Sequence, residues 1–571
     1  MNPVTVKDFL PTSAKEVAAL GWDYLDVILF NGDAYIDHPS FGAAVIGRIL
    51  QQQGYRVAIV PQPNWRDDLR DFRKLGAPRL FFGVTAGSMD SMVNHYTANL
   101  RLRSDDAYTP DGRAGQRPDY AVTVYSKILK QLYPHVPVVV GGIEASLRRL
   151  THYDYWSDSL KPSVLIDSGA DLLIYGMGDK VICEVAKALR NGYNAKLLRK
   201  LRQVGFVADE AYVSRLPENT IRLNSFERCC SDVDAFCDNF VKMEVESNRL
   251  QQDAVLVEQT GGSYVVINPP YTQLSQEELD NSFDLPYTRL PHPRYKGKAI
   301  PAYEMIKHSV NIHRGCFGGC AFCTISAHQG KFINSRSERS ILAEIEKVTH
   351  MPEFKGYVSD IGGPSANMYG MHGHDLSLCA RCIRPSCLHP HPCANLDNSH
   401  ERLLDLYAKI GRVKGVKKAF IGSGIRYDLF EEDNCRYLRE VIVNHTSGRL
   451  KVAPEHTEDH VLQLMRKPSF RLFHQLNDDF KRICREEGLK YQLVPYFISS
   501  HPGCTEEDMK RLSHETKSLN FHLEQVQDLT PTPMTLSSVM FYAGKDPYTG
   551  RPLFVARDQE SKRKQKSWFF K

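Results

Sequence analysis

Three cysteines stand close together in the stretch "HRGCFGGCAFCTI", which runs from His313 to Ile325. Cys316, Cys320 and Cys323 have C-x3-C-x2-C spacing. A structural zinc site takes four protein ligands, and this loop offers only three. A [4Fe–4S] cluster held by three thiolates leaves one iron open for a substrate or cofactor. The alternative is a structural zinc site whose fourth ligand lies elsewhere in the chain.

The surroundings of these cysteines favour the cluster. Gly315, Gly318 and Gly319 let backbone amides approach the sulfurs, and hydrogen bonds to sulfur tune the potential of a cluster. The loop follows an apolar run at 309–313 that predicts a strand. Because parallel α/β folds place their chemistry at the C-terminal ends of strands, we expect the loop to lie at a catalytic face.

A second group of cysteines lies in the stretch "CARCIRPSCLHPHPC". It supplies four thiols, from Cys379, Cys382, Cys387 and Cys393. Four thiolates this close in sequence can close a tetrahedral zinc site or hold an auxiliary iron–sulfur cluster. The spacing is not that of a standard zinc ribbon and does not decide between the two metals. A surface insertion with reduced thiols is the alternative.

The composition limits where the protein works. The chain has 571 residues and 14 cysteines, and its beginning, "MNPVTVKDFLPTSAKEV", lacks the layout of a secretion signal. We therefore expect a cytoplasmic protein whose thiols serve metal ligation or catalysis. No apolar run approaches the ~18 residues that cross a bilayer, so no membrane partner is expected. The net charge of +5 gives no support to a nucleic-acid partner, which stays open.

The elements that must position these cysteines form two alternating series. In residues 1–215, apolar runs such as "LDVILF" precede helix-like stretches such as "FGAAVIGRILQQQG". This pattern predicts βα units and a parallel sheet covered on both faces, in a Rossmann-like N-terminal domain. Residues 216–300 are less regular, rich in Pro, Asp and Tyr, and are expected to be a connector.

The second series occupies residues 301–555. Its candidate strands are "SVNIH", "GYVSDIGG", "KKAFIGSGI", "RLKVAPEH", "YQLVPYFISS" and "LEQVQDLTP". Such a series predicts a partial (β/α)6 barrel, with the cysteine-rich segment 371–395 as an insertion. The basic residues 556–571 are expected to form a solvated tail. The predicted fold class is therefore α/β throughout.

A cysteine triad with C-x3-C-x2-C spacing and an aromatic residue before its last cysteine resembles the signature of radical S-adenosylmethionine (SAM) enzymes. The resemblance implies that Cys316, Cys320 and Cys323 ligate a [4Fe–4S] cluster, that SAM chelates its open iron, and that Phe322 lies against the adenine. In that superfamily the reduced cluster cleaves SAM and leaves a 5′-deoxyadenosyl radical that abstracts a substrate hydrogen. An electron donor of the flavodoxin or ferredoxin type is implied as well.

Downstream segments extend this resemblance. "DIGGPSANMYG" is similar to a Gly-Gly-Glu-like turn whose backbone holds the amino group of SAM. Gly362 and Gly363 match that turn, and Pro364 replaces its acidic residue, which leaves a backbone-only contact. Asp360 and Glu455 lie at predicted strand ends and are candidates for contacts with SAM or substrate, with capping or ion pairing as the alternative.

Three longer stretches resemble the YgiQ-type radical SAM family over nearly the whole chain. They are "GWDYLDVILFNGDAYIDHPSFGAAVIGRILQQQGY", "VVVGGIEASLRRLTHYDYWSD" and "CIRPSCLHPHPCANLDNSH". The N-terminal domain is similar to cobalamin-binding domains, but "DAYIDHPSFG" does not reproduce their Asp-x-His-x-x-Gly motif. Cobalamin is therefore doubtful as a cofactor, and His38 is expected to be structural or to meet an unknown substrate. No catalytic side chain is assigned.

Three functions fit these observations. The first is a radical SAM enzyme that acts on an unknown substrate. The second is a methylthiotransferase-like modification of RNA or protein, although such enzymes carry three more N-terminal cysteines and the first 228 residues here contain only Cys183. The third is a non-catalytic iron–sulfur protein that senses redox state. A pure sensor needs no Gly-Gly turn, which disfavours it.

Overall fold

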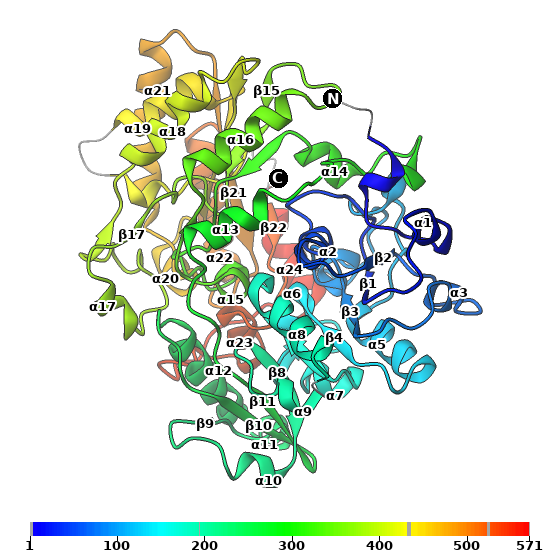
Figure 1. Cartoon of the computed structure of the whole chain (residues 1–571). Coiled ribbons are helices and arrows are strands. Elements are labelled where there is room, and N and C mark those ends of the chain that lie inside the picture. The colour runs from blue at the N-terminus through cyan, green and yellow to red at the C-terminus, as the bar shows by residue number, and fades with distance from the viewer. Residues whose placement is uncertain (1–3, 193–194, 431–434, 522–525, 570–571) are drawn as a thin grey trace. The chain divides into compact units, whose positions relative to one another are not determined.

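The computed structural model describes residues 4–192, 195–430, 435–521 and 526–569 (Figure 1). The chain divides into two compact units. The first unit comprises Met1–Met243, Gln252–Thr272 and Asn281–Lys307, and the second comprises Glu244–Gln251, Gln273–Asp280 and His308–Lys571. Among the described residues, no helix combines the length and apolar character that crossing a membrane requires.

The first unit is built on one sheet, which has nine strands within the described residues, in the order β2-β1-β3-β4-β7-β8-β11-β10-β9. The strands are β1 (Val27–Asn31), β2 (Val57–Pro61), β3 (Phe81–Thr85), β4 (Val138–Val140), β7 (Leu172–Ile174), β8 (Val204–Ala208), β9 (Ile221–Arg222), β10 (Leu256–Thr260) and β11 (Ser263–Ile267). The run from β2 to β7 is parallel, and β8 and β11 pair antiparallel. The predicted Rossmann-like domain is confirmed.

Short helices and a hairpin surround this sheet. The helices are α1 (Ala14–Ala19), α2 (Gly42–Gln52), α3 (Arg70–Arg73), α4 (Ser91–His95), α5 (Ala121–Leu132), α6 (Gly142–Leu147), α7 (Val164–Ser168), α8 (Asp179–Arg190), α9 (Ala195–Leu198), α10 (Glu210–Val213), α11 (Phe226–Ser231) and α14 (Pro301–Ile306). Strands β5 (His152–Asp154) and β6 (Ser159–Lys161) form the hairpin. Residues 216–300, expected as a connector, contribute β9, β10 and β11 to the sheet.

The second unit repeats the strand–helix alternation. Its parallel strands are β12 (Ser309–Asn311), β15 (Tyr357–Val358) with β16 (Asp360–Gly362), β19 (Lys418–Ala419), β20 (Arg449–Glu455), β21 (Gln492–Ser499) and β22 (Val526–Asp528). Neighbours in chain order pair in parallel, through β12–β16, β15–β19, a bridge between Ile425 and Val452, and β20–β21–β22. The predicted strands are found in this order, with residues 523–525 at the start of "LEQVQDLTP" outside the described residues, and the partial (β/α)6 barrel is confirmed.

Helices connect these strands, and most of them bury an apolar face in one core. The helices are α15 (Ile325–Gln329), α16 (Glu338–Thr349), α17 (Leu376–Ala380), α18 (Glu401–Ile410), α19 (Cys435–His445), α20 (Asp459–Met465), α21 (Phe470–Glu486), α22 (Glu506–Ser518), α23 (Leu536–Ala543) and α24 (Gln559–Ser567). Of these, α15 and α17 have no buried residue. Helices α12 (Val233–Ser247) and α13 (Gln276–Phe283) contribute residues to both units. Helix α16 packs against α18, and α19 packs against α21 (Figure 1).

The basic segment at 556–571 is not the solvated tail that the sequence predicts. It forms α24, which packs on α22, β21 and β22. Lys562 and Gln565 lie on one face of this helix and are buried. The Gln565 side chain accepts a hydrogen bond from the Ser500 N–H and donates one to the Cys504 carbonyl, both within 2.9 Å. These polar contacts hold α24 against the segment around Ser500 and Cys504, although the helix carries many charged residues.

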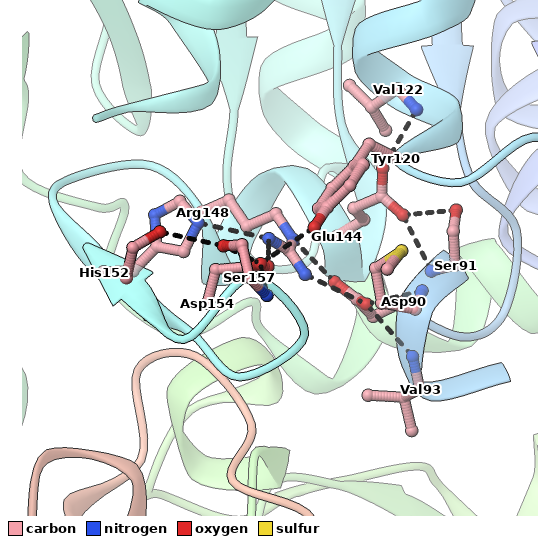
Figure 2. A network of polar contacts seen from close by, with 12 residues as sticks. Asp90, Ser91, Val93, Tyr120, Val122, Glu144, Arg148, His152, Asp154 and Ser157 are labelled. Carbon is pink, nitrogen blue, oxygen red and sulfur yellow. Dashed lines mark hydrogen bonds and ion pairs between the residues drawn. The ribbon is translucent and has the colours of Figure 1, made fainter. Parts of the chain in front are cut away.

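A buried polar network orders the loops that follow β3 and β4 (Figure 2). Arg148 donates hydrogen bonds to Asp90 at 2.8 Å and to Asp154 at 3.0 Å, and all three side chains are at most 4% exposed. Asp90 also caps the N-terminus of α4. Glu144 on α6 accepts hydrogen bonds from the backbone of Ser91, at 2.8 Å, and of Val122, at 2.9 Å. One guanidinium thus ties together three segments of the first unit.

Replacing Arg148 by Met should lower the free energy of unfolding by about 3–5 kcal/mol, because two buried carboxylates would lose their cation. Urea unfolding followed by circular dichroism measures this loss. Arg101 is exposed and serves as the control, so the unfolding midpoint of Arg101→Met should stay near that of the parent protein. Equal unfolding midpoints for both variants would contradict the role given to Arg148.

Candidate functional site

The loop that carries the first three cysteines begins at the end of β12 and β13 (His313–Arg314). Gly315 has a φ of 85°, and a Cβ there would lie 2.1 Å from the Phe332 carbonyl oxygen, so only glycine fits. The Cys316 N–H donates to the Gly330 carbonyl at 3.2 Å, and the Ala321 N–H donates to the Met465 carbonyl at 3.0 Å. The loop is therefore held on two sides.

Each of the three cysteines is half-buried, and Cys320 acts electrostatically on the other two. Burial is the first cause that raises the pKa of Cys316 and the pKa of Cys323, the latter to about 12, and the charge of Cys320 raises both further. Backbone N–H groups oppose this, since Gly318 donates to the Cys316 sulfur and Ile325 to the Cys323 sulfur. Such thiols stay protonated at neutral pH unless a metal takes the proton's place.

The spacing of the sulfurs is too wide for zinc. In the described residues, the trio Glu458, His460 and Asp508 brings its ligand atoms within 4.8 Å of one another, and no three cysteines do so. Zn–S bonds of about 2.3 Å in a tetrahedron place sulfurs about 3.8 Å apart. The wider arrangement suits a cluster, because its irons lie between the sulfurs. In this trio, Arg511 pairs with both carboxylates.

Arg426 is a member of the site that the sequence did not reveal. Its side chain is 9% exposed, and its Nη1 donates to the Cys320 sulfur at 3.2 Å. Asp428 accepts two hydrogen bonds from the same guanidinium, at 2.8 and 2.5 Å. A Cβ on Gly318 would lie 2.6 Å from Nη1, so the cation covers the cysteine loop. The available signal was an arginine directly after the predicted strand "KKAFIGSGI".

The Gly-Gly turn at the end of β16 lies beside this loop. A Cβ on Gly363 would lie 2.4 Å from the His313 ring, and the Ser365 hydroxyl is 3.7 Å from the Cys316 sulfur. His313 is 1% exposed, and both of its ring nitrogens lack a hydrogen-bond partner in the described chain. Burial lowers its pKa to about 3, so the ring is neutral. Its nitrogens are free to meet a polar ligand group.

Two of the strand-end carboxylates have different surroundings. Asp360 accepts hydrogen bonds from the N–H groups of Gly422 and Ser423, at 2.8 and 3.2 Å, so it caps the turn after β19. Glu455 has a φ of 71° and lies 3.7 Å from the Lys467 ammonium. Burial is the first cause that raises the pKa of Glu455, and Lys467 and Arg426 lower it. Glu455 therefore belongs to the charged surroundings of the cysteines.

Other residues that the sequence singled out lie in three places. Phe322 is half-buried and packs against the core of the second unit. His38 is buried in the first unit, where its Nδ1 accepts a hydrogen bond from the Ser40 N–H at 3.1 Å. The second group of cysteines lies in the second unit, between β17 (His372–Gly373) and β18 (Leu396–Asp397). All of these thiols are free.

Comparison with known proteins gives matches along the whole chain. A family model described as Radical SAM N-terminal matches residues 9–309. The UPF0313 protein of Porphyromonas gingivalis is 60% identical over 578 aligned residues, which cover 100% of this chain and 91% of that protein. UPF0313 protein YgiQ of Escherichia coli K12 is 43% identical, over 98% of this chain and 83% of that protein.

A solved structure also resembles this chain. It is the radical S-adenosylmethionine methyltransferase TsrM from Kitasatospora setae, with cobalamin and a [4Fe–4S] cluster bound. The two chains align with a TM-score of 0.49 and 14% sequence identity, over 89% of this chain and 74% of that one.

Proposed function

Because the chain belongs to the UPF0313 family of radical SAM enzymes, we propose that Cys316, Cys320 and Cys323 hold a [4Fe–4S] cluster with one iron open to SAM. The observation that carries this proposal is a set of three half-buried thiols beside one fixed guanidinium, in a described chain where no three cysteine sulfurs lie within 4.8 Å of one another, as zinc would require. When bound, such a cluster supplies the electron that cleaves SAM reductively and starts radical chemistry on a substrate.

The side chains around the thiols suit a negatively charged cluster. Arg426 donates a charge-assisted hydrogen bond to sulfur, which withdraws electron density and makes the bound cluster easier to reduce. Its bidentate contact with Asp428 keeps the guanidinium in one orientation. Backbone N–H donors to two sulfurs act in the same direction.

The SAM contacts that we propose lie around the same loop. The Gly362–Gly363 turn offers backbone atoms to the methionine end of SAM, and the unpartnered nitrogens of His313 lie against this turn. Glu455 acts electrostatically on Cys323 and is a candidate contact for the ribose hydroxyls, while Phe322 is a candidate for the adenine. A buried histidine without partners is costly unless a ligand satisfies it, which supports a polar group here.

The proposal includes the setting that this chemistry requires. Reductive cleavage of SAM consumes one electron, so we propose a small donor of the flavodoxin or ferredoxin type in the cytoplasm. The free thiols of both cysteine groups suit a reducing compartment.

Changing Cys316, Cys320 and Cys323 together to Ala should remove about four irons per chain and abolish formation of 5′-deoxyadenosine from SAM under dithionite. Iron and sulfide analysis of anaerobically purified protein, together with chromatography of the SAM products, measures both losses. A matched control changes three cysteines outside both groups, Cys183, Cys230 and Cys435, to Ala. Loss of iron in the control, or SAM cleavage by the first variant, would contradict the assignment.

A second variant tests the cation. Replacing Arg426 by Met together with Asp428 by Asn removes a buried charge pair without leaving either member alone. The reduced cluster loses its hydrogen-bonded cation, so its reduction potential should fall by roughly 40 mV, which is about 1 kcal/mol for one electron. Redox titration followed by electron paramagnetic resonance measures the shift. Arg426→Lys should keep most of the potential, and an unchanged potential in the double variant would rule out this role.

A further inference from the structure

The insertion at 371–395 carries four cysteines, and the buried Lys331 contacts the sulfur of one of them, Cys382. Strands β17 and β18 pair antiparallel and close the insertion at its base. The Cys382 N–H donates to the Cys379 carbonyl at 3.2 Å, and the Cys393 N–H donates to the Cys387 carbonyl at 2.8 Å. These two turns bring the cysteines together as two pairs.

Polar donors face two of these sulfurs. The Lys331 ammonium lies 3.8 Å from the Cys382 sulfur, and the Asn395 side chain donates a hydrogen bond to the Cys379 sulfur at 3.5 Å. Donors that face sulfur suit thiolates better than neutral thiols.

Lys331 carries a charge that the protein otherwise leaves without a counter-ion. It is 3% exposed, and its Nζ donates to the Arg384 carbonyl at 2.6 Å, to the Asn248 carbonyl at 3.4 Å and to the Cys382 sulfur at 3.8 Å. Within the described ranges, no carboxylate oxygen lies within 4.0 Å of it. A buried ammonium is costly unless a negative group pairs with it. Neutral thiols supply no such charge, whereas thiolates on a metal do.

We propose that Cys379, Cys382, Cys387 and Cys393 hold a second iron–sulfur cluster, with Lys331 as its charge partner. Iron is favoured over zinc because, in the described chain, no three of these sulfurs lie within 4.8 Å of one another. A zinc ion would draw them to about 3.8 Å. Four protein thiolates complete the ligand set, so this cluster has no open iron for SAM. The proposal does not depend on the SAM site.

The second loop also holds the backbone of the first. The Cys387 N–H donates to the Phe317 carbonyl at 3.0 Å, and the Ser386 hydroxyl donates to the Gly318 carbonyl at 2.7 Å. A Cβ on Gly319 would lie 2.2 Å from the Pro385 carbonyl oxygen, so the two loops are in direct backbone contact. A cluster that fixes the second loop therefore also stabilises the loop that carries Cys316, Cys320 and Cys323.

The first experiment measures metal bound at the second site alone, in protein that lacks the first group of cysteines. In the full chain, Cys316, Cys320 and Cys323 are changed to Ala, and anaerobically reconstituted protein is analysed for iron, sulfide and zinc, with Mössbauer spectroscopy for cluster type. About four irons and four sulfides per chain should remain, without zinc. One zinc per chain, or no metal at all, would overturn the proposal. Should the first site hold no cluster, the parent protein would show the same four irons, which separates the two proposals.

Two further variants test the ligands and the lysine. Adding Cys382→Ala and Cys387→Ala to the triple variant should remove the remaining iron, whereas adding Cys230→Ala and Cys435→Ala should not. In the triple variant, Lys331→Met should keep the iron but lower the potential of the remaining cluster, because its cation is gone. Iron that remains after the loss of Cys382 and Cys387 would contradict the ligand assignment. A reduction potential that is unchanged by Lys331→Met would contradict the role given to Lys331.

Discussion

The second unit depends on holding three half-buried thiols next to one fixed cation. Burial alone keeps Cys316 and Cys323 protonated, and only a metal that binds thiolates reverses that preference. Arg426 is oriented by Asp428 before any metal arrives, so the site is preorganised for negative charge. The Gly-Gly turn and the His313 ring lie against each other on the side where a further ligand would meet the proposed cluster. The barrel strands serve to bring these segments to one end.

The same physical requirement recurs in the cysteine-rich insertion. Lys331 lies among carbonyl oxygens and a sulfur, so a nearby negative group would stabilise its buried positive charge. In the same way, a nearby positive group stabilises the thiolates of the first cysteine group. Ser386 and Cys387 connect the two loops through the backbone of Phe317 and Gly318. The two cysteine groups therefore form one polar assembly in which each loop limits the movement of the other.

The amino-acid pattern predicted the barrel well because parallel strands buried on both faces leave continuous apolar runs. It failed at 216–300, where β9, β10 and β11 join the sheet through the pairing of β11 with β8, a contact between segments distant in sequence. The many basic residues at 556–571 led to the prediction of a solvated tail, so the buried face of α24 was not predicted. The cysteines could be recognised from spacing, but Arg426 and Lys331 could not, since a buried cation looks like any surface arginine or lysine until the fold encloses it.

The open iron is the central claim, and SAM labelled with 15N at its amino group tests it most directly. In the reduced protein, electron–nuclear double resonance should show hyperfine coupling between this nitrogen and the cluster of Cys316, Cys320 and Cys323, and the coupling should vanish in their triple Ala variant. A reduced cluster with SAM bound and no coupling to the label would contradict the account.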